Sequence, residues 1–138
     1  MVGDMSTGNI ANRMQRGRER LTRPMPQKRL EPLLQLAVRR IRTKFPQVRR
    51  IVLFGSYAAG RPTTHSDLDF FIVMPTRRNW RDRARQLYSI FPERPLPMDF
   101  VVRTPREVRE RLTTYFCPFT REVMTKGRVL YEAEAGRS

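Results

Sequence analysis

Residues 51–74, IVLFGSYAAGRPTTHSDLDFFIVM, restrict the fold more than any other part of the sequence. They contain two apolar runs. The first begins at Arg50, one residue before this stretch, and stops abruptly after residue 54 at a Gly-Ser pair, which is typical of a buried strand that leads into a tight turn. The second run starts with Asp67 and, two residues later, Asp69. Because side chains alternate along a strand, both carboxylates are predicted to lie on the same face.

Two carboxylates at the entrance of an apolar strand repel each other and lose hydration unless a cation or a proton neutralises them. Magnesium is commonly held by one or two carboxylates together with substrate phosphate oxygens. Gly55 and Ser56 suit the phosphate half of such a site, because glycine lets backbone N–H groups approach a phosphate and serine adds a hydroxyl donor. The stretch therefore predicts a site for magnesium and a phosphorylated substrate.

The spacing of these residues is similar to a known signature. Gly55-Ser56, ten intervening residues and Asp67-Leu68-Asp69-Phe70 resemble the motif of the DNA polymerase beta type nucleotidyltransferase superfamily. The gap between them and the Tyr-Glu ending near residue 132 resemble the small prokaryotic branch, the minimal nucleotidyltransferases, over roughly residues 29–132. The resemblance implies an α/β nucleotidyltransferase fold, with a small mixed β-sheet flanked by helices.

A phosphate-binding P-loop is the competing interpretation, because Gly55 and Gly60 have the spacing of its two glycines. The next two positions exclude it. Arg61 stands where the P-loop has its lysine, and Pro62 stands where it has its metal-binding hydroxyl.

The resemblance implies roles for individual residues. Asp67 and Asp69 would be catalytic metal ligands, and Asp99, the acid of the apolar run 98–102, would be the third ligand and a candidate base. The alternative for Asp99 is an edge-strand acid that faces water. Nucleotide binding is assigned to the Gly-Ser pair and to two residues of the following loop: Gly55, Ser56, Arg61 and Ser66. Ser66 could instead be a plain turn residue, and Arg61 an exposed arginine without a role.

The reaction implied is attack of an acceptor hydroxyl on the α-phosphorus of a nucleoside triphosphate, with ATP as the donor and Mg²⁺ as the cofactor. Members with other acceptors carry extra domains, whereas the small size of this chain resembles antitoxins that transfer AMP to a tyrosine of a HEPN-type toxin. The resemblance thus implies a protein partner and a hetero-oligomer. Two alternatives stay open: a module that neutralises its partner by contact alone, and a transferase directed at RNA or a small molecule.

Length and composition suit a single domain of 138 residues. We expect a basic, disordered leader at residues 1–27, the nucleotidyltransferase domain at 28–133 and a flexible tail at 134–138. The sequence has no run long enough for a membrane span and no signal peptide, so a cytoplasmic protein without membrane contact is predicted.

The net charge of +15 is concentrated before the site, since residues 1–50 hold 13 basic and 3 acidic residues. A basic leader could bind nucleic acid through its phosphates. The favoured interpretation is a solvated surface in a chain that uses arginine heavily, because only three of its 28 basic residues are lysines.

Periodicity predicts the remaining elements. Apolar residues at three- and four-residue steps indicate helices over residues 31–45, 80–91, 104–115 and 120–126, and short apolar runs indicate strands at 98–102 and 129–132. In the second and third of these helices, Trp80 and Leu112 are expected to face the core.

Overall fold

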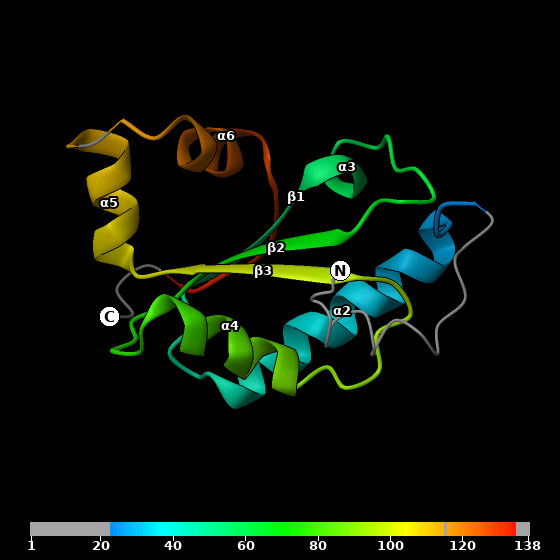
Figure 1. The fold of residues 1–138 in the computed structure, drawn as a ribbon, viewed down its shortest axis with the longest axis horizontal. Helices are drawn as coiled ribbons and strands as arrows, with labels where there is room; N and C mark the ends of the chain where they lie inside the picture. Colours follow the sequence, from blue (N-terminus) through cyan, green and yellow to red (C-terminus); the bar gives the residue numbers. More distant parts are fainter. Residues whose placement is uncertain (1–22, 115, 135–138) are drawn as a thin grey trace.

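The computed structural model describes residues 23–114 and 116–134 (Figure 1). Helix α2 (Gln27–Lys44) precedes strand β1 (Arg50–Phe54), the short helix α3 (Gly55–Ala58) and strand β2 (Leu68–Val73). Helix α4 (Trp80–Ser89) and strand β3 (Met98–Arg103) follow. The chain then forms helices α5 (Pro105–Thr113) and α6 (Pro118–Lys126) and ends in strand β4 (Arg128–Glu132).

The four strands form one mixed sheet in the order β3-β2-β1-β4. Strand β1 is antiparallel to both β2 and β4, whereas β2 and β3 run parallel. This arrangement confirms the predicted mixed sheet flanked by helices. Its register places Phe54 opposite Asp69 and places Asp69 opposite Asp99. The predicted site residues of three strand regions therefore meet at one end of β2.

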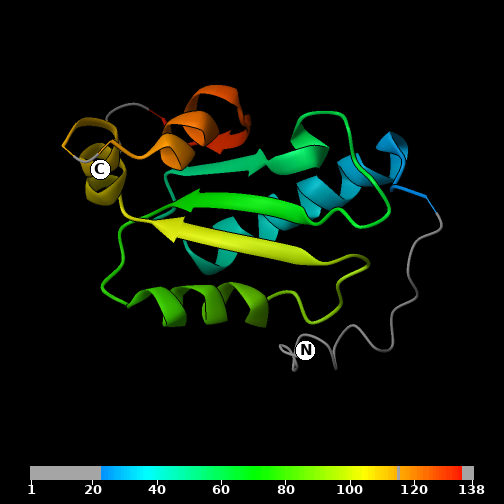
Figure 2. The same ribbon diagram turned by 45° about the horizontal axis from the view of Figure 1, so that its top comes forward.

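Strand alternation sorts the sheet into two faces. Leu53, Phe70 and Phe100 point to one face, where they pack in a buried core with α2 and α4. These two helices lie on the same side of the sheet in Figure 2. Burial of this apolar surface is the main stabilising contribution to such a fold.

The opposite face carries a smaller apolar cluster that packs under α5 and α6. Val52 and Phe71 from the sheet meet Val108 of α5 and Val123 of α6 there. Helix α5 starts with a capping box, in which Thr104 accepts the N–H of Glu107 and Glu107 accepts the N–H of Thr104, as the sequence indicates. These helices cover only part of this face, and its uncovered end carries Asp69 and Asp99.

The first helix starts earlier than predicted, at residue 27 and not at residue 31. Pro26 is the N-cap and Pro32 lies within α2, so the proline that marks the helix start is the earlier of the two. Met25 is buried in the core, and its backbone N–H donates to the Tyr57 hydroxyl (3.0 Å). Residues 1–22, which make up most of the predicted basic leader, lie outside the described residues.

Two predicted core residues are exposed. Trp80 is 53% exposed and Leu112 is 40% exposed. Helix α4 buries Leu87, as predicted, and also Arg83, whose guanidinium forms an ion pair with Glu107 (2.8 Å) and donates to the carbonyl oxygen of Val102 (3.2 Å). An arginine can be buried in this way because its planar fork is satisfied by several acceptors. Among the described helices, none is long and apolar enough to span a membrane.

Candidate active site

Gly55 and Asp69 are in direct contact at the point where β1 ends and α3 begins. Gly55 has φ +81°, a conformation that glycine adopts without steric cost. A Cβ atom at Gly55 would overlap Oδ2 of Asp69 and would lie 3.1 Å from its Cγ. The absence of a side chain at residue 55 therefore leaves the space in which the Asp69 carboxylate lies.

The Asp69 carboxyl group is half-buried beside two other acids. Burial, followed by the negative charges of Asp99 and Asp67, raises its pKa from 3.8 to about 6. Asp69 and Asp99 are opposite residues of two parallel strands, so their side chains project from the same face of the sheet. The sheet register thus creates the crowding of carboxylates that the sequence predicts.

Asp99 is exposed, and Tyr88 of α4 is its neighbour. The Tyr88 hydroxyl donates to the backbone carbonyl of Met98 (3.1 Å) and to Oδ1 of Asp99 (3.4 Å). Burial, followed by the charge of Asp99, raises the pKa of Tyr88 to about 12, so the phenol keeps its proton at neutral pH. The sequence placed Tyr88 only in the core, and no sequence signal marks its hydroxyl as part of the site.

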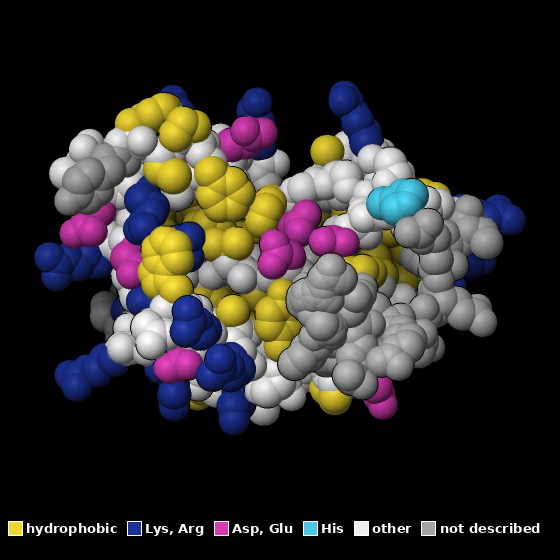
Figure 3. Space-filling model, viewed as in Figure 1, with side chains coloured by type: hydrophobic (Ala, Val, Ile, Leu, Met, Phe, Trp, Pro, Cys, Tyr) yellow, Lys and Arg dark blue, Asp and Glu magenta, His cyan; other side chains and the backbone are white. Residues whose placement is uncertain are grey.

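Asp67 precedes the first residue of β2 and is half-buried. Its charge acts on both Asp69 and Tyr88, which places it beside them. In the view of Figure 3, acidic side chains gather near the middle of the molecule. Apolar side chains lie between them and a group of basic side chains.

The donor set fits a hard divalent cation, because it consists of carboxylate oxygens whose mutual repulsion such an ion relieves. In the described part of the chain, no three His, Cys, Asp or Glu side chains are already arranged around one metal position. Magnesium is commonly held by one or two carboxylates and completes its octahedron with water and substrate phosphates. The carboxylates present suit that mode of binding.

A hydroxyl network fixes the loop after α3. Ser56 donates from Oγ to Oγ of Ser66 (2.6 Å), and the backbone N–H of Thr63 donates to the same Ser66 oxygen (2.8 Å). Ser66 thus contacts Ser56 directly and ties the two ends of the loop together. The backbone N–H of Arg61 donates to the carbonyl oxygen of Ser56 (2.9 Å), while its side chain is exposed.

A hollow of about 500 Å³ lies between α3 and α6. Gly55, Ser56 and Arg61 line one side of it, and Phe119 and Lys126 of α6 line the other. Sequence reasoning missed both α6 residues, because nothing near them marks their return to the Gly-Ser turn. Its lining has one cationic side chain on each side and one carboxylate, that of Glu122, so the net charge of the hollow is positive and suits an anionic group.

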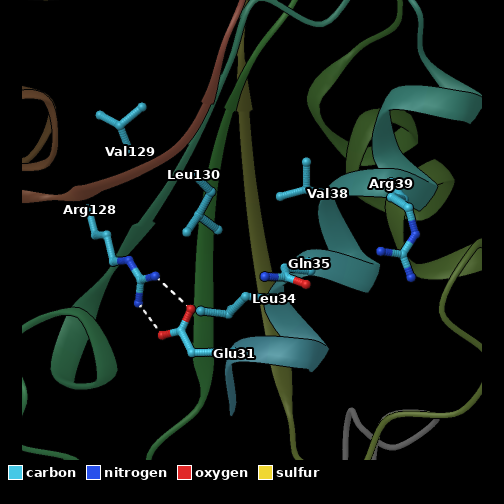
Figure 4. A pocket seen from close by; sticks show the side chains of 8 residues that line it. All are labelled: Glu31, Leu34, Gln35, Val38, Arg39, Arg128, Val129 and Leu130. Atoms are coloured by element: carbon cyan, nitrogen blue, oxygen red, sulfur yellow. Dashed lines mark hydrogen bonds and ion pairs between the residues drawn. The ribbon is translucent and has the colours of Figure 1, made fainter. Parts of the chain in front are cut away.

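A second hollow of about 400 Å³ lies between α2 and the edge strand β4 (Figure 4). The Arg128 guanidinium closes one end of it with two hydrogen bonds to the Glu31 carboxylate (both 2.7 Å). Its lining residues belong to α2 and β4, and none of the predicted site residues is among them.

The comparisons with known proteins identify the family of this chain. The family model described as "Nucleotidyltransferase domain" matches residues 34–131, which include every predicted site residue. The chain therefore belongs to the nucleotidyltransferase domain family. No match was found among curated proteins.

Solved structures share the fold at low sequence identity. A candidate nucleotidyltransferase from Sulfolobus solfataricus has a TM-score of 0.57 and 22% identity, over 81% of this chain and 88% of its own. A chain of a mutant MntA–HpeT toxin–antitoxin complex has a TM-score of 0.51 and 22% identity, over 72% of each chain. These likenesses confirm the nucleotidyltransferase fold. Nucleotidyltransferases generally use a divalent metal such as Mg²⁺.

The raised pKa of Asp69 predicts how stability depends on pH. The folded chain holds the Asp69 proton up to about pH 6, whereas an unfolded aspartate releases it near 3.8. The contribution of this group to stability is therefore complete below pH 3.8 and is lost as the pH rises through 6. We expect the melting temperature of Asp69→Asn to exceed that of the parent at pH 7, with the difference vanishing toward pH 4.

Thermal unfolding of both proteins across this pH range, in EDTA and in magnesium chloride, measures the effect. Magnesium should narrow the difference at pH 7, because a bound cation favours the ionised carboxylates of the parent. A parent that is as stable as Asp69→Asn at every pH would contradict the assigned repulsion.

Proposed function

We propose that this chain transfers AMP from ATP to a tyrosine hydroxyl of a HEPN-type protein partner, and that this modification gives it an antitoxin role. The observation that carries the proposal is the group of carboxylates, Asp67, Asp69 and Asp99, beside the Gly55–Ser56 turn on an uncovered part of the sheet. A structural neighbour from a toxin–antitoxin complex, MntA–HpeT, supports a partner protein.

Asp69, together with Asp67 or Asp99, would hold magnesium in this proposal. A bound magnesium ion supplies neutralisation of the phosphate charge and a lower pKa for the attacking hydroxyl. The backbone N–H of Gly55 and the hydroxyl of Ser56 would donate to the β- and γ-phosphate oxygens. Arg61 and Lys126, which line the hollow next to this turn, would face the same anionic groups.

The proposed reaction forms a bond between the tyrosine oxygen and the α-phosphorus of ATP and breaks the bond from that phosphorus to the bridging oxygen of the β-phosphate. Pyrophosphate leaves, and the tyrosine proton passes to Asp99, the exposed carboxylate of the group. Tyr88 holds Asp99 through its hydroxyl and so orients the accepting oxygen. Ser66 holds Ser56 through its Oγ until the phosphates replace that contact.

Incubation with each α-labelled nucleoside triphosphate and magnesium tests the proposal, with and without the product of the neighbouring gene. Intact mass and peptide mapping of both proteins then locate any added nucleotide. We expect AMP on a tyrosine of the partner in the parent reaction and none in the Asp69→Asn reaction. Tight complex formation without transfer would favour a binding module, and label on RNA or a small molecule would favour a different acceptor.

A further inference from the structure

Two arginines stack on an exposed tryptophan at the far end of β3 from the carboxylates. The Arg103 guanidinium carbon lies 3.9 Å from the centroid of the Trp80 ring, and that of Arg111 lies 5.5 Å from it. Trp80 is the first residue of α4, Arg103 ends β3 and Arg111 belongs to α5, so three elements form the group. Stacking on an aromatic face holds each guanidinium in one place and leaves its N–H donors available.

Positive charge exceeds negative charge in this group. Arg83 and Arg103 both donate to the carbonyl oxygen of Val102, at 3.2 Å and 3.0 Å, so two guanidinium groups share one acceptor. Glu107 bonds Arg83 with both carboxylate oxygens (2.8 Å and 3.2 Å) and also accepts the backbone N–H of Thr104. Burial, followed by the charge of Arg111, lowers the pKa of Arg103. An added carboxylate would relieve this repulsion.

This group lies on the same face of the sheet as the carboxylates of the site. Asp99, Val101 and Arg103 alternate along β3, so all three project to one side. Arg103 is four residue steps along the strand from Asp99, a distance of about 13 Å. The strand surface between them carries half-buried Val101, whereas Phe71 of the neighbouring strand is fully buried in the cluster beneath α5 and α6. A ligand that spans this surface would reach both groups.

Helices α4, α5 and α6 and the loop before α6 carry exposed apolar side chains. Phe116 is 66% exposed and Phe119 is 42% exposed, and Leu112 of α5 and Trp80 are exposed as well. Tryptophan, phenylalanine and arginine are enriched at protein interfaces and among the residues that dominate binding energy. A nucleic acid would instead favour a continuous row of cations along a phosphate backbone. The composition of this surface therefore favours a protein.

We propose that Trp80, Arg103, Arg111, Leu112, Phe116 and Phe119 form the docking surface for the protein acceptor, and that the surface binds an acceptor segment with acidic side chains next to apolar ones. The proposal rests on the proposed function for the identity of the acceptor as a protein. A segment held there by a carboxylate between Arg103 and Arg111 places a hydroxyl about 13 Å away, beside Asp99. Binding at this surface selects the acceptor, and the carboxylates of the site act on it.

The binding step can be measured without catalysis, because Trp80 is the only tryptophan of the chain. Titration with the copolymer poly(Glu,Tyr), in the absence of ATP, should change the fluorescence of Trp80 when only tryptophan is excited. The double variant Arg103→Gln/Arg111→Gln should bind the copolymer about tenfold more weakly or worse. The matched control is Arg29→Gln/Arg39→Gln, which removes the same charge from exposed positions of α2 and should bind like the parent.

Phe116→Ser is a second variant. Because Phe116 is exposed, this substitution should leave the fold intact. It should also weaken binding while its melting temperature stays unchanged. Equal affinities of the double variant and its α2 control would overturn the proposal. Tighter binding of a single-stranded oligouridylate of equal charge, lost in the double variant, would also overturn it, because the surface would then be a nucleic-acid site.

A parallel titration in the Asp69→Asn background separates this proposal from the proposed function. Copolymer binding should be unchanged there, whatever the outcome of the transfer assay. Conversely, a double variant that modifies the protein partner with an unchanged KM would overturn the docking surface and leave the proposed reaction standing.

Discussion

Replacing Asp69 by asparagine is expected to reduce nucleotidyl transfer by on the order of 10³-fold or more while the fold stays intact. The negative charges of both Asp99 and Asp67 raise the pKa of Asp69, so its carboxylate lies close to each of them. The proposed metal ligands are Asp69 with either Asp67 or Asp99. The substitution therefore removes a ligand from both arrangements. The amide is nearly the same size and relieves the repulsion, so the packing around it should hold.

The measurement is transfer of α-labelled AMP at saturating magnesium, together with the melting temperature of the same preparation. Glu93→Gln is the matched control, because it makes the same chemical change at an exposed loop position. It should retain full activity. A folded Asp69→Asn protein that transfers AMP at a rate near that of the parent would show that this carboxylate has no catalytic role.

The spacing of a few residues was enough to predict the core of the fold. The buried strand and the acid-led strand are present as β1 and β2, and the predicted Gly-Ser turn between them is the start of the short helix α3. The start of the predicted helix at residue 104 is also confirmed, because its capping box depends only on Thr104 and Glu107. These signals depend only on neighbouring residues, so they can be interpreted without knowing which parts of the chain pack together.

Tertiary contacts account for what the sequence could not predict. Helical periodicity placed Trp80 inward, yet α4 buries Arg83 together with Leu87, and the charge of Arg83 is neutralised by Glu107 from another helix. Leu112 is exposed because α5 covers the sheet only through Val108. The same limitation hid Tyr88, Phe119 and Lys126, which approach the site from α4 and α6 only after the chain folds back.

Replacing Gly55 by alanine is expected to reduce transfer by on the order of 10²-fold or more, because a displacement of about 1 Å at reacting groups has an effect of that size. The new Cβ atom would overlap Oδ2 of Asp69, so the carboxylate must move. Alanine would also be strained at φ +81°, at a cost of roughly 1–2 kcal/mol in the free energy of unfolding. The substitution therefore combines backbone strain with displacement of a proposed metal ligand.

Gly60→Ala separates these two effects. Gly60 has nearly the same conformation, φ +75°, but a Cβ atom there would meet nothing within 4 Å. Both variants should thus lose roughly 1–2 kcal/mol of stability in denaturant unfolding from backbone strain, while only Gly55→Ala should lose transfer activity. Equal losses of activity would assign the effect to the conformation of the loop and remove the argument that Gly55 makes room for Asp69. Activity lost at residue 55 alone would tie catalysis to the position of that carboxylate.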